Sequence, residues 1–299
     1  MNNVQKTQRG IVWNAPSSSL AESIETLLEA VDLYEVLQGE QQLVLKPNLV
    51  EALEPPITTP AAFVEAIVTR LATHCPHLQI IIADGTGSLS YDTFHCFDVL
   101  GYLPLAKRDN VQLVDLNREP SRHLHNSDCT RWPEMYLPEL LFNSFLISLP
   151  VLKAHSLSRV TLTMKNMMGC APPAHFQGSG GWGKSSFHRQ IHAAIFDLNR
   201  YRTPDFTIMD ASVGMARAHL WGPTCNPPVG KIVAAYDPVA IDAYGTSLLG
   251  KSWKDIDHIS MAHQVLGCAE PLVVEELLGE ETYKNEKGEA TRTLSLLPE

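Results

Sequence analysis

The chain has 299 residues, of which 44% are hydrophobic and 19% are charged, and its formal net charge is -10 at pH 7. This composition is typical of a globular protein with a large core, and the acidic balance argues against a general nucleic-acid binder, which needs a basic face. Because no run of about 18 apolar residues occurs, no membrane-spanning helix is expected. The polar N-terminus lacks the apolar core of a secretory signal. We therefore expect a cytoplasmic protein without nucleic-acid or membrane partners.

The first half of the chain alternates helical and strand patterns. From Leu20 onward, apolar residues recur at helical spacing, which predicts a first helix over residues 20–31. Thr58 and Thr59 precede Pro60, which predicts a hydroxyl cap with proline in the first turn of a second helix. We also expect strands at 42–45, 78–83 and 111–115, a helix at 93–100, and an irregular surface excursion at 118–134.

The second half continues this alternation. Asp237 and Pro238 predict a helix start with a carboxylate cap. The remaining predicted elements are strands at 145–149, 205–210 and 231–236, helices at 185–201 and 254–265, a long loop at 214–230 and a frayed tail from Gly279. The pattern as a whole predicts an α/β protein with a mostly parallel central sheet and helices on both faces. We expect a single domain over 1–299, with a small lobe formed by 118–140 and 214–230.

Polar side chains follow several of the predicted strands. In open parallel sheets, ligands bind outside the carboxyl ends of the strands, so these side chains are candidates for one site. The candidate catalytic residues are His155, Lys165, Asp84 and Asp210, and the candidate substrate-binding residues are Lys46, Asn48, Lys153, Asn166, Lys184 and Ser185. For Asp84 and Lys46, a turn aspartate and a solvated lysine are the ordinary alternatives. The concentration of lysines predicts a small anionic ligand.

The glycine-rich segment 178–185 matches the pattern G-x-x-x-x-G-K-S of a nucleotide-binding P-loop. In a P-loop, Lys184 would reach the outer phosphates and Ser185 would bind magnesium. That arrangement requires a core strand directly before the loop, whereas Pro172 and Pro173 precede it here. Nucleotide binding at 178–185 is therefore a minor alternative.

Three histidines form a candidate metal site. His188 and His192 are four residues apart in a predicted helix and would share one face, and His155 could supply a third ligand. Arg189 follows His188, which excludes the zinc-metalloprotease motif. The ordinary alternative is a pair of histidines that hydrogen-bond within the structure. A divalent or transition metal is thus a candidate cofactor.

The six cysteines are scattered and contain no Cys-x-x-Cys spacing, so no intrinsic iron–sulfur or zinc motif is expected. The simplest interpretation is free thiols in a reducing cytosol.

The motifs also occur together in one order. They are Lys46-Pro47-Asn48, Asp84-Gly85, Lys153-x-His155, Thr163-x-Lys165-Asn166-x-x-Gly169, Asp210 and Asp237-Pro238-Val239-Ala240-Ile241-Asp242. In this order and spacing they resemble the family called domain of unknown function 362, over roughly residues 40–270. Members often carry an added ferredoxin-like iron–sulfur domain, so the resemblance implies an external electron donor as a partner. The cysteine spacing of such a domain is absent here.

Two classes of function remain open at this point. The first is an enzyme acting on a small anionic substrate, either by proton transfer of the racemase, isomerase or lyase type, or as a reductase, with or without a metal. The second is a non-catalytic accessory protein that binds a metal or cofactor. A homo-oligomer is compatible with either. In the enzyme hypothesis, Lys153 and Lys165 clamp the anion and His155 moves the proton, with Lys165 as the alternative base.

Overall fold

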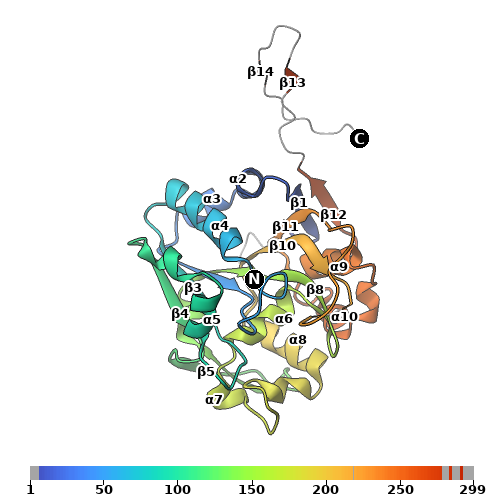
Figure 1. Cartoon of the computed structure of the whole chain (residues 1–299). Helices are drawn as coiled ribbons and strands as arrows, with labels where there is room; N and C mark the ends of the chain where they lie inside the picture. The colour runs from blue at the N-terminus through green and yellow to red at the C-terminus, as the bar shows by residue number, and fades with distance from the viewer. Residues whose placement is uncertain (1–6, 218, 278–282, 285–289, 292–299) are drawn as a thin grey trace.

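The computed structural model describes residues 7–217, 219–277, 283–284 and 290–291, and a large mixed sheet lies at its centre (Figure 1). Its main path has the strand order β12-β1-β11-β10-β7-β2-β3-β4, and β8 and β9 attach beside β10. These strands are β1 (Ile11–Pro16), β2 (Gln42–Pro47), β3 (Gln79–Asp84), β4 (Val111–Asp115), β7 (Phe145–Leu149), β8 (Val151–His155), β9 (Arg159–Thr161), β10 (Phe206–Met215), β11 (Lys231–Ala235) and β12 (Val273–Glu276).

The sheet is mostly parallel, as the sequence predicts. β10, β7, β2, β3 and β4 pair in parallel along the path. β11, which we expected among the parallel central strands, instead runs antiparallel to both β10 and β1. The reason is the connection: the described residues between β10 and β11, 216–217 and 219–230, contain no helix, and an antiparallel neighbour needs no crossover helix.

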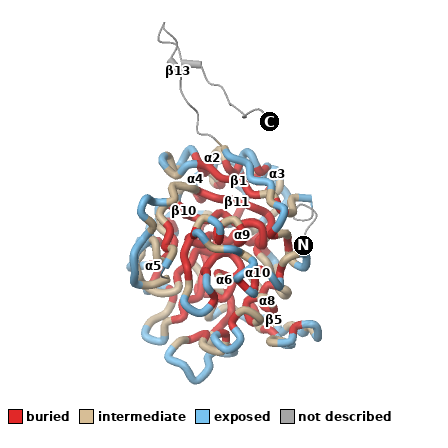
Figure 2. The backbone as a smooth tube through the Cα atoms, turned by 90° about the vertical axis from the view of Figure 1, so that its right-hand side faces the viewer, coloured by how far each residue is buried: buried red, intermediate tan, exposed pale blue. Residues whose placement is uncertain are grey.

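Helices cover both faces of the sheet. Successive strand residues point to opposite faces, so Leu43 and Leu45 join one core cluster and Val44 joins the other. The first cluster includes α2 (Leu20–Ala30), α4 (Ala61–His74) and α5 (Thr93–Val99), and the second includes α8 (Ile191–Tyr201), α9 (Pro238–Leu248) and α10 (Asp257–Ala262). Figure 2 shows the buried strands between these layers. The prediction of an α/β fold with helices on both faces is confirmed.

Two predicted helix starts differ from the structure. α4 begins at Ala61 without a side-chain cap. The Thr59 hydroxyl instead donates to the carbonyl of Leu149, at 2.7 Å, and accepts from the N–H of Asn48, at 2.8 Å, so it joins the ends of β2 and β7. The predicted helix at 254–265 is divided into a 3-10 turn, η5 (Trp253–Asp255), and the short α10.

The predicted helix over 185–201 is interrupted. A 3-10 turn, η4 (Ser185–His188), is followed by Gln190 in the left-handed region at φ 55°, and α8 starts only at Ile191. The expectation that His188 and His192 share one helix face is therefore wrong. Apolar spacing continued across the break, so periodicity alone did not reveal it.

The predicted irregular excursion at 118–134 contains an antiparallel hairpin of β5 (Ser121–His125) and β6 (Glu134–Pro138). Arg122 in β5 forms an ion pair with Glu139 just beyond β6, and its guanidinium lies over the ring of Phe142. The expected frayed tail from Gly279 lies largely outside the described residues, of which only β13 (Tyr283–Lys284) and β14 (Ala290–Thr291) belong to it.

Two buried aspartates fix helix ends. Asp237 caps α9 as predicted, accepting from the N–H groups of Val239, at 2.8 Å, and Ala240, at 3.0 Å. Asp242, within α9, accepts from the N–H groups of Thr163, at 2.7 Å, and Met164, at 3.0 Å. These N–H groups open the short helix α6 (Thr163–Asn166), so Asp242 has a buried structural role.

Among the described residues, no helix is long and apolar enough to cross a membrane.

Candidate functional site

A cavity of about 260 Å³ opens beyond the carboxyl ends of β2 and β3. The predicted site residues that line it are Lys46, Asn48, Asp84, His155, Lys165, Asn166, Lys184 and His188. They come from segments far apart in the sequence, because parallel strands end at one edge of the sheet and the hairpin of β8 and β9 and helix α6 follow β7 directly.

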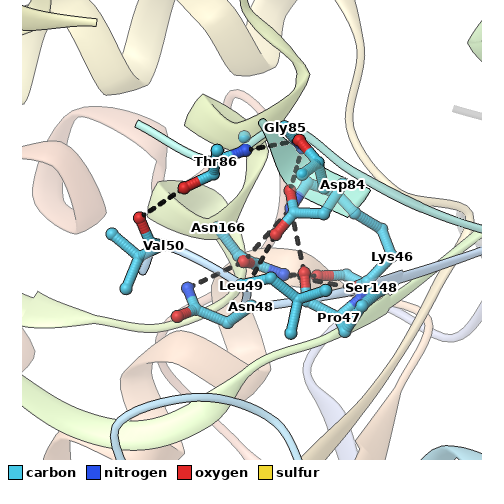
Figure 3. A network of polar contacts seen from close by, with 12 residues as sticks. Lys46, Pro47, Asn48, Leu49, Val50, Asp84, Gly85, Thr86, Ser148 and Asn166 are labelled. Atoms are coloured by element: carbon cyan, nitrogen blue, oxygen red, sulfur yellow. Dashed lines mark hydrogen bonds and ion pairs between the residues drawn. The ribbon is translucent and has the colours of Figure 1, made fainter. Parts of the chain in front are cut away.

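The centre of the site is a buried ion pair between Lys46 and Asp84 (Figure 3). The Lys46 Nζ lies 2.6 Å from Asp84 Oδ1, and the two side chains are 0% and 2% exposed. Asp84 also accepts from the N–H groups of Leu49, at 2.6 Å, and Gly85, at 2.9 Å. Because its oxygens are already engaged, Asp84 orients Lys46 and the following loop rather than presenting a free carboxylate to a ligand.

A chain of hydrogen bonds extends this pair across the sheet edge. Asn166 Oδ1 accepts from Lys46 Nζ at 3.3 Å and from Asn48 Nδ2 at 3.0 Å, and Asn48 Oδ1 accepts from Lys153 Nζ at 3.1 Å. Lys153 also donates to the carbonyl of Ile57. Burial, with a further contribution from the positive charge of Lys165, lowers the pKa of Lys153 to about 7. Lys153 is outside the cavity lining but is linked to it through Asn48.

Lys184 reaches the same site from the glycine-rich segment. Its Nζ donates to Asn117 Oδ1 at 2.9 Å and to the carbonyl of Gly169 at 2.7 Å, and burial lowers its pKa to about 8. The segment itself does not form a P-loop: the short helix α7 (Pro173–Phe176) precedes it in place of a strand, and a four-residue 3-10 turn follows. The Ser185 hydroxyl accepts from the N–H of Gly178 at 2.9 Å and does not line the cavity.

Lys165 differs from the other lysines of the site. It lines the cavity from α6, and within the described part of the chain its ammonium has no hydrogen-bond or ion-pair partner. Burial lowers its pKa from 10.5 to about 8. Its amine is therefore free to contact a ligand and is partly unprotonated near neutral pH.

His155 is held by the turn that follows it. Its Nδ1 accepts from the N–H groups of Leu157, at 3.1 Å, and Ser158, at 3.2 Å, which leaves the proton of the neutral ring on Nε2. Burial and the nearby charge of Lys165 hold the pKa of His155 far below its usual range. The ring of His219 lies 4.1 Å away, between centroids. His155 is thus a neutral hydrogen-bond donor.

The predicted metal site of His155, His188 and His192 is not assembled. His192 instead faces His258, with their Nδ1 atoms 3.0 Å apart, and does not line the cavity. Within the described residues, no three His, Cys, Asp or Glu side chains are placed to hold a metal ion. A metal-bound histidine normally donates its second ring N–H, whereas His155 accepts at Nδ1, so its tautomer does not fit a ligand at Nε2.

Asp210 lies outside the lining. It is 8% exposed in β10, and its Oδ1 accepts from the N–H of Ser212 at 2.9 Å. The sequence predicted that Asp210 ends its strand. Instead β10 continues to Met215, so Asp210 lies within the strand.

Sequence reasoning missed several lining groups. Trp182, His219 and Leu157 also line the cavity. Two positions require glycine because side chains of the site approach the backbone closely there. A Cβ on Gly169 would overlap the Asp84 carboxylate and Lys46, and a Cβ on Gly85 would overlap Asn117. The only sequence signal for these glycines was their place in the motifs, directly after Asp84 and three residues after Asn166.

The chain is similar to several known proteins. The thylakoid-associated protein sll1697 from Synechocystis sp. is 26% identical over 249 residues, which cover 78% of this chain and 71% of that protein. The lactate racemase apoprotein from Thermoanaerobacterium thermosaccharolyticum aligns with a TM-score of 0.44 and 10% identity, over 81% of this chain and 57% of that chain. The family model of the domain of unknown function DUF362 matches residues 43–247, which contain every strand end and lysine of the site, and the chain therefore belongs to this family.

Proposed function

We propose that this protein is an enzyme that exchanges a proton at the carbon next to the carboxylate of a small anionic substrate, with Lys165 as the base. The observation that carries the proposal is the contrast between the lysines. Lys46, Lys153 and Lys184 donate to protein acceptors, whereas Lys165 has none among the described residues and its pKa is lowered to about 8.

The surrounding charges support an anionic substrate. Lys46 and Lys184 line the cavity beside Lys165, and Asp84 is the carboxylate that partly balances them. Removal of a proton next to a carboxylate places further negative charge on the carboxylate oxygens, and fixed cations and N–H donors stabilise that charge. The Nε2–H of His155 can supply one such donor. Met168, Trp182 and Leu157 offer an apolar wall for the substituent of the substrate.

These roles differ from those expected from the sequence, in which Lys153 and Lys165 bind the anion and His155 moves the proton. A histidine can act as a base only through an unprotonated nitrogen that faces the substrate. The Nδ1 of His155 is occupied by the N–H groups of Leu157 and Ser158, and its other nitrogen carries the proton. Lys165 therefore becomes the base and His155 the hydrogen-bond donor. Proton transfer of this kind is carried out by racemases, isomerases and some lyases. The chemistry of the cavity supports this set of enzymes as a whole.

Deuterium exchange tests the proposal directly. The protein is incubated in D₂O with small 2-hydroxy, 2-amino and 3-keto acids, and loss of the Cα–H signal is followed by proton NMR. We expect exchange faster than in the protein-free solution with at least one of these classes, and only the protein-free rate with Lys165→Met. Equal exchange rates in the two proteins would show that Lys165 is not the base. Binding of an acid without exchange would favour a non-catalytic binding protein.

The pH dependence of kcat/KM provides a second test. Activity requires Lys165 unprotonated, so it should rise toward the pKa of about 8. It also requires positive charge on Lys184, with a pKa of about 8, so it should fall as that lysine loses its proton. We expect a bell-shaped profile with a narrow maximum near pH 8. A profile that stays flat from pH 6 to 9 would contradict this assignment.

A further inference from the structure

A second cavity, of about 540 Å³, adjoins the first and shares His155, Ser156 and His219 with it. We propose that this second cavity binds a phosphate group of the substrate whose carboxylate end enters the first cavity. The inference deepens the proposed function, because it names a second anionic group on the same substrate. The cavity and its charges nevertheless make it testable by itself.

Three cationic side chains converge on this second cavity: Arg159, Arg217 and Lys251. In the part of the chain that the structure describes, none of the three has a side-chain hydrogen bond or an ion pair. By contrast, Arg122 and Arg202 are held by Glu139 and Asp205. Asp255 is the one carboxylate among the described lining residues, so positive charge exceeds negative charge there. A dianionic group is the ligand that such a surplus fits.

The local structure places Arg159 beside the first cavity. β8 and β9 form a tight hairpin in which Arg159 pairs directly with His155 across the strands. Side chains of directly opposed residues in an antiparallel pair lie on the same face, and both residues line the second cavity. Arg159 has φ 70°, a conformation that side-chain-bearing residues adopt at a cost of about 1 kcal/mol or more. The hairpin thus presents an arginine where a glycine would be less strained.

Hydroxyl donors complete the lining. The Ser252 Oγ accepts from the N–H of Lys254 at 3.2 Å, which leaves its own O–H free to donate into the cavity. Ser156 lies on the wall that both cavities share. Arginine forks donate in pairs to phosphate oxygens, and the hydroxyls offer further donors for the oxygens that a phosphate has beyond the two of a carboxylate. The second cavity is also about twice the volume of the first, which leaves room for a hydrated phosphate.

Calorimetric titration with inorganic phosphate at low ionic strength tests the site. We expect the triple variant Arg159→Gln, Arg217→Gln and Lys251→Gln to bind phosphate at least about tenfold more weakly than the wild type, because it loses the charged donors. Lys165→Met, in the first cavity, should change the affinity by less than about threefold, since only a screened, more distant charge is removed. Lys107→Gln removes one exposed charge outside both cavities and serves as the control.

Two outcomes would overturn the inference. Phosphate could bind equally well to the triple variant and the wild type, or it could fail to bind the wild type at all. Loss of affinity in Lys165→Met together with retention in the triple variant would place phosphate in the first cavity instead. If the triple variant loses phosphate binding while no acid undergoes deuterium exchange, the phosphate site stands and the proposed proton transfer does not.

Compounds that carry both groups test whether one ligand spans the two cavities. We expect 2-phosphoglycolate or 3-phosphoglycerate to bind the wild type at least about tenfold more tightly than inorganic phosphate, because linking two bound groups makes the second contact intramolecular. That gain should disappear in Lys184→Met, which removes a cation of the first cavity that would bind the carboxylate end. No gain over inorganic phosphate in the wild type for either compound would show that the second cavity binds free phosphate rather than part of such a substrate.

Discussion

Replacing Lys165 with methionine is expected to abolish turnover, by about 1000-fold or more, and to raise the free energy of unfolding at pH 7 by about 2 kcal/mol. Burial lowers the pKa of Lys165 from 10.5 to about 8. The unfolded chain therefore binds the proton more tightly than the native protein does. Below pH 8 the native protein bears the full cost of the buried ammonium, and this cost disappears as the pH rises toward 10.5. Methionine keeps the length of the side chain and removes the charge.

Urea unfolding at pH 7 and near pH 10.5 measures this effect. The stability gain of Lys165→Met should be largest at pH 7 and should nearly vanish at the higher pH, where the native lysine is already neutral. Lys165→Arg is the matched control, because it keeps the charge and cannot supply a free base. That variant should lose turnover without becoming more stable. Full turnover in Lys165→Met together with loss of turnover in His155→Ala would reverse the two roles.

Replacing Asp84 with alanine should lower the free energy of unfolding by about 3–5 kcal/mol. The change leaves the ammonium of Lys46, which is 0% exposed, without its carboxylate. It also removes the acceptor of the N–H groups of Leu49 and Gly85. An uncompensated buried charge is more costly than the loss of a surface ion pair, because water cannot solvate it.

Two further variants separate the charge from the hydrogen bonds. Adding Lys46→Met to Asp84→Ala should restore part of the lost stability, since the buried ammonium is removed with its partner. Glu270→Ala breaks the exposed pair with Lys254, whose atoms lie 2.8 Å apart, and should change the free energy of unfolding far less than Asp84→Ala does, because water solvates both charges. If Asp84→Ala and Glu270→Ala unfold at the same urea concentration, the Lys46–Asp84 pair is not the structural centre of the site.

The strands were predictable because their local sequence determines them. The apolar runs of β3 and β7 are buried on both faces, and only a central strand of a layered fold accommodates them. The direction of β11 could not be read from its apolar run, which would be the same in either direction. The loop predicted at 214–230, which has no helix among its described residues, was the signal for an antiparallel strand. Likewise, the break at Gln190 depends on one backbone angle that helical spacing does not reveal.

The position of the candidate site was predictable from the sequence, but the contacts of its residues were not. Lys46 and Asp84 follow their strands directly, so fold class alone brings them to one edge. Which lysine remains free depends on contacts between distant segments, such as Lys46 with Asn166 and Lys153 with the carbonyl of Ile57. The tautomer of His155 depends on how the 155–158 turn closes, which spacing does not show.

The chain of hydrogen bonds from Asp84 through Lys46, Asn166 and Asn48 to Lys153 also bears on how the site responds to charge. In water, solvent dipoles must rotate when an anion forms, and that reorganisation forms part of the barrier to reaction. Here the dipoles and charges are fixed by one another before any substrate enters, so the cost of aligning them is borne when the protein folds. A site of this kind changes little in shape during a reaction; in the proposed reaction, only the proton of the substrate carbon needs to move, to the amine of Lys165.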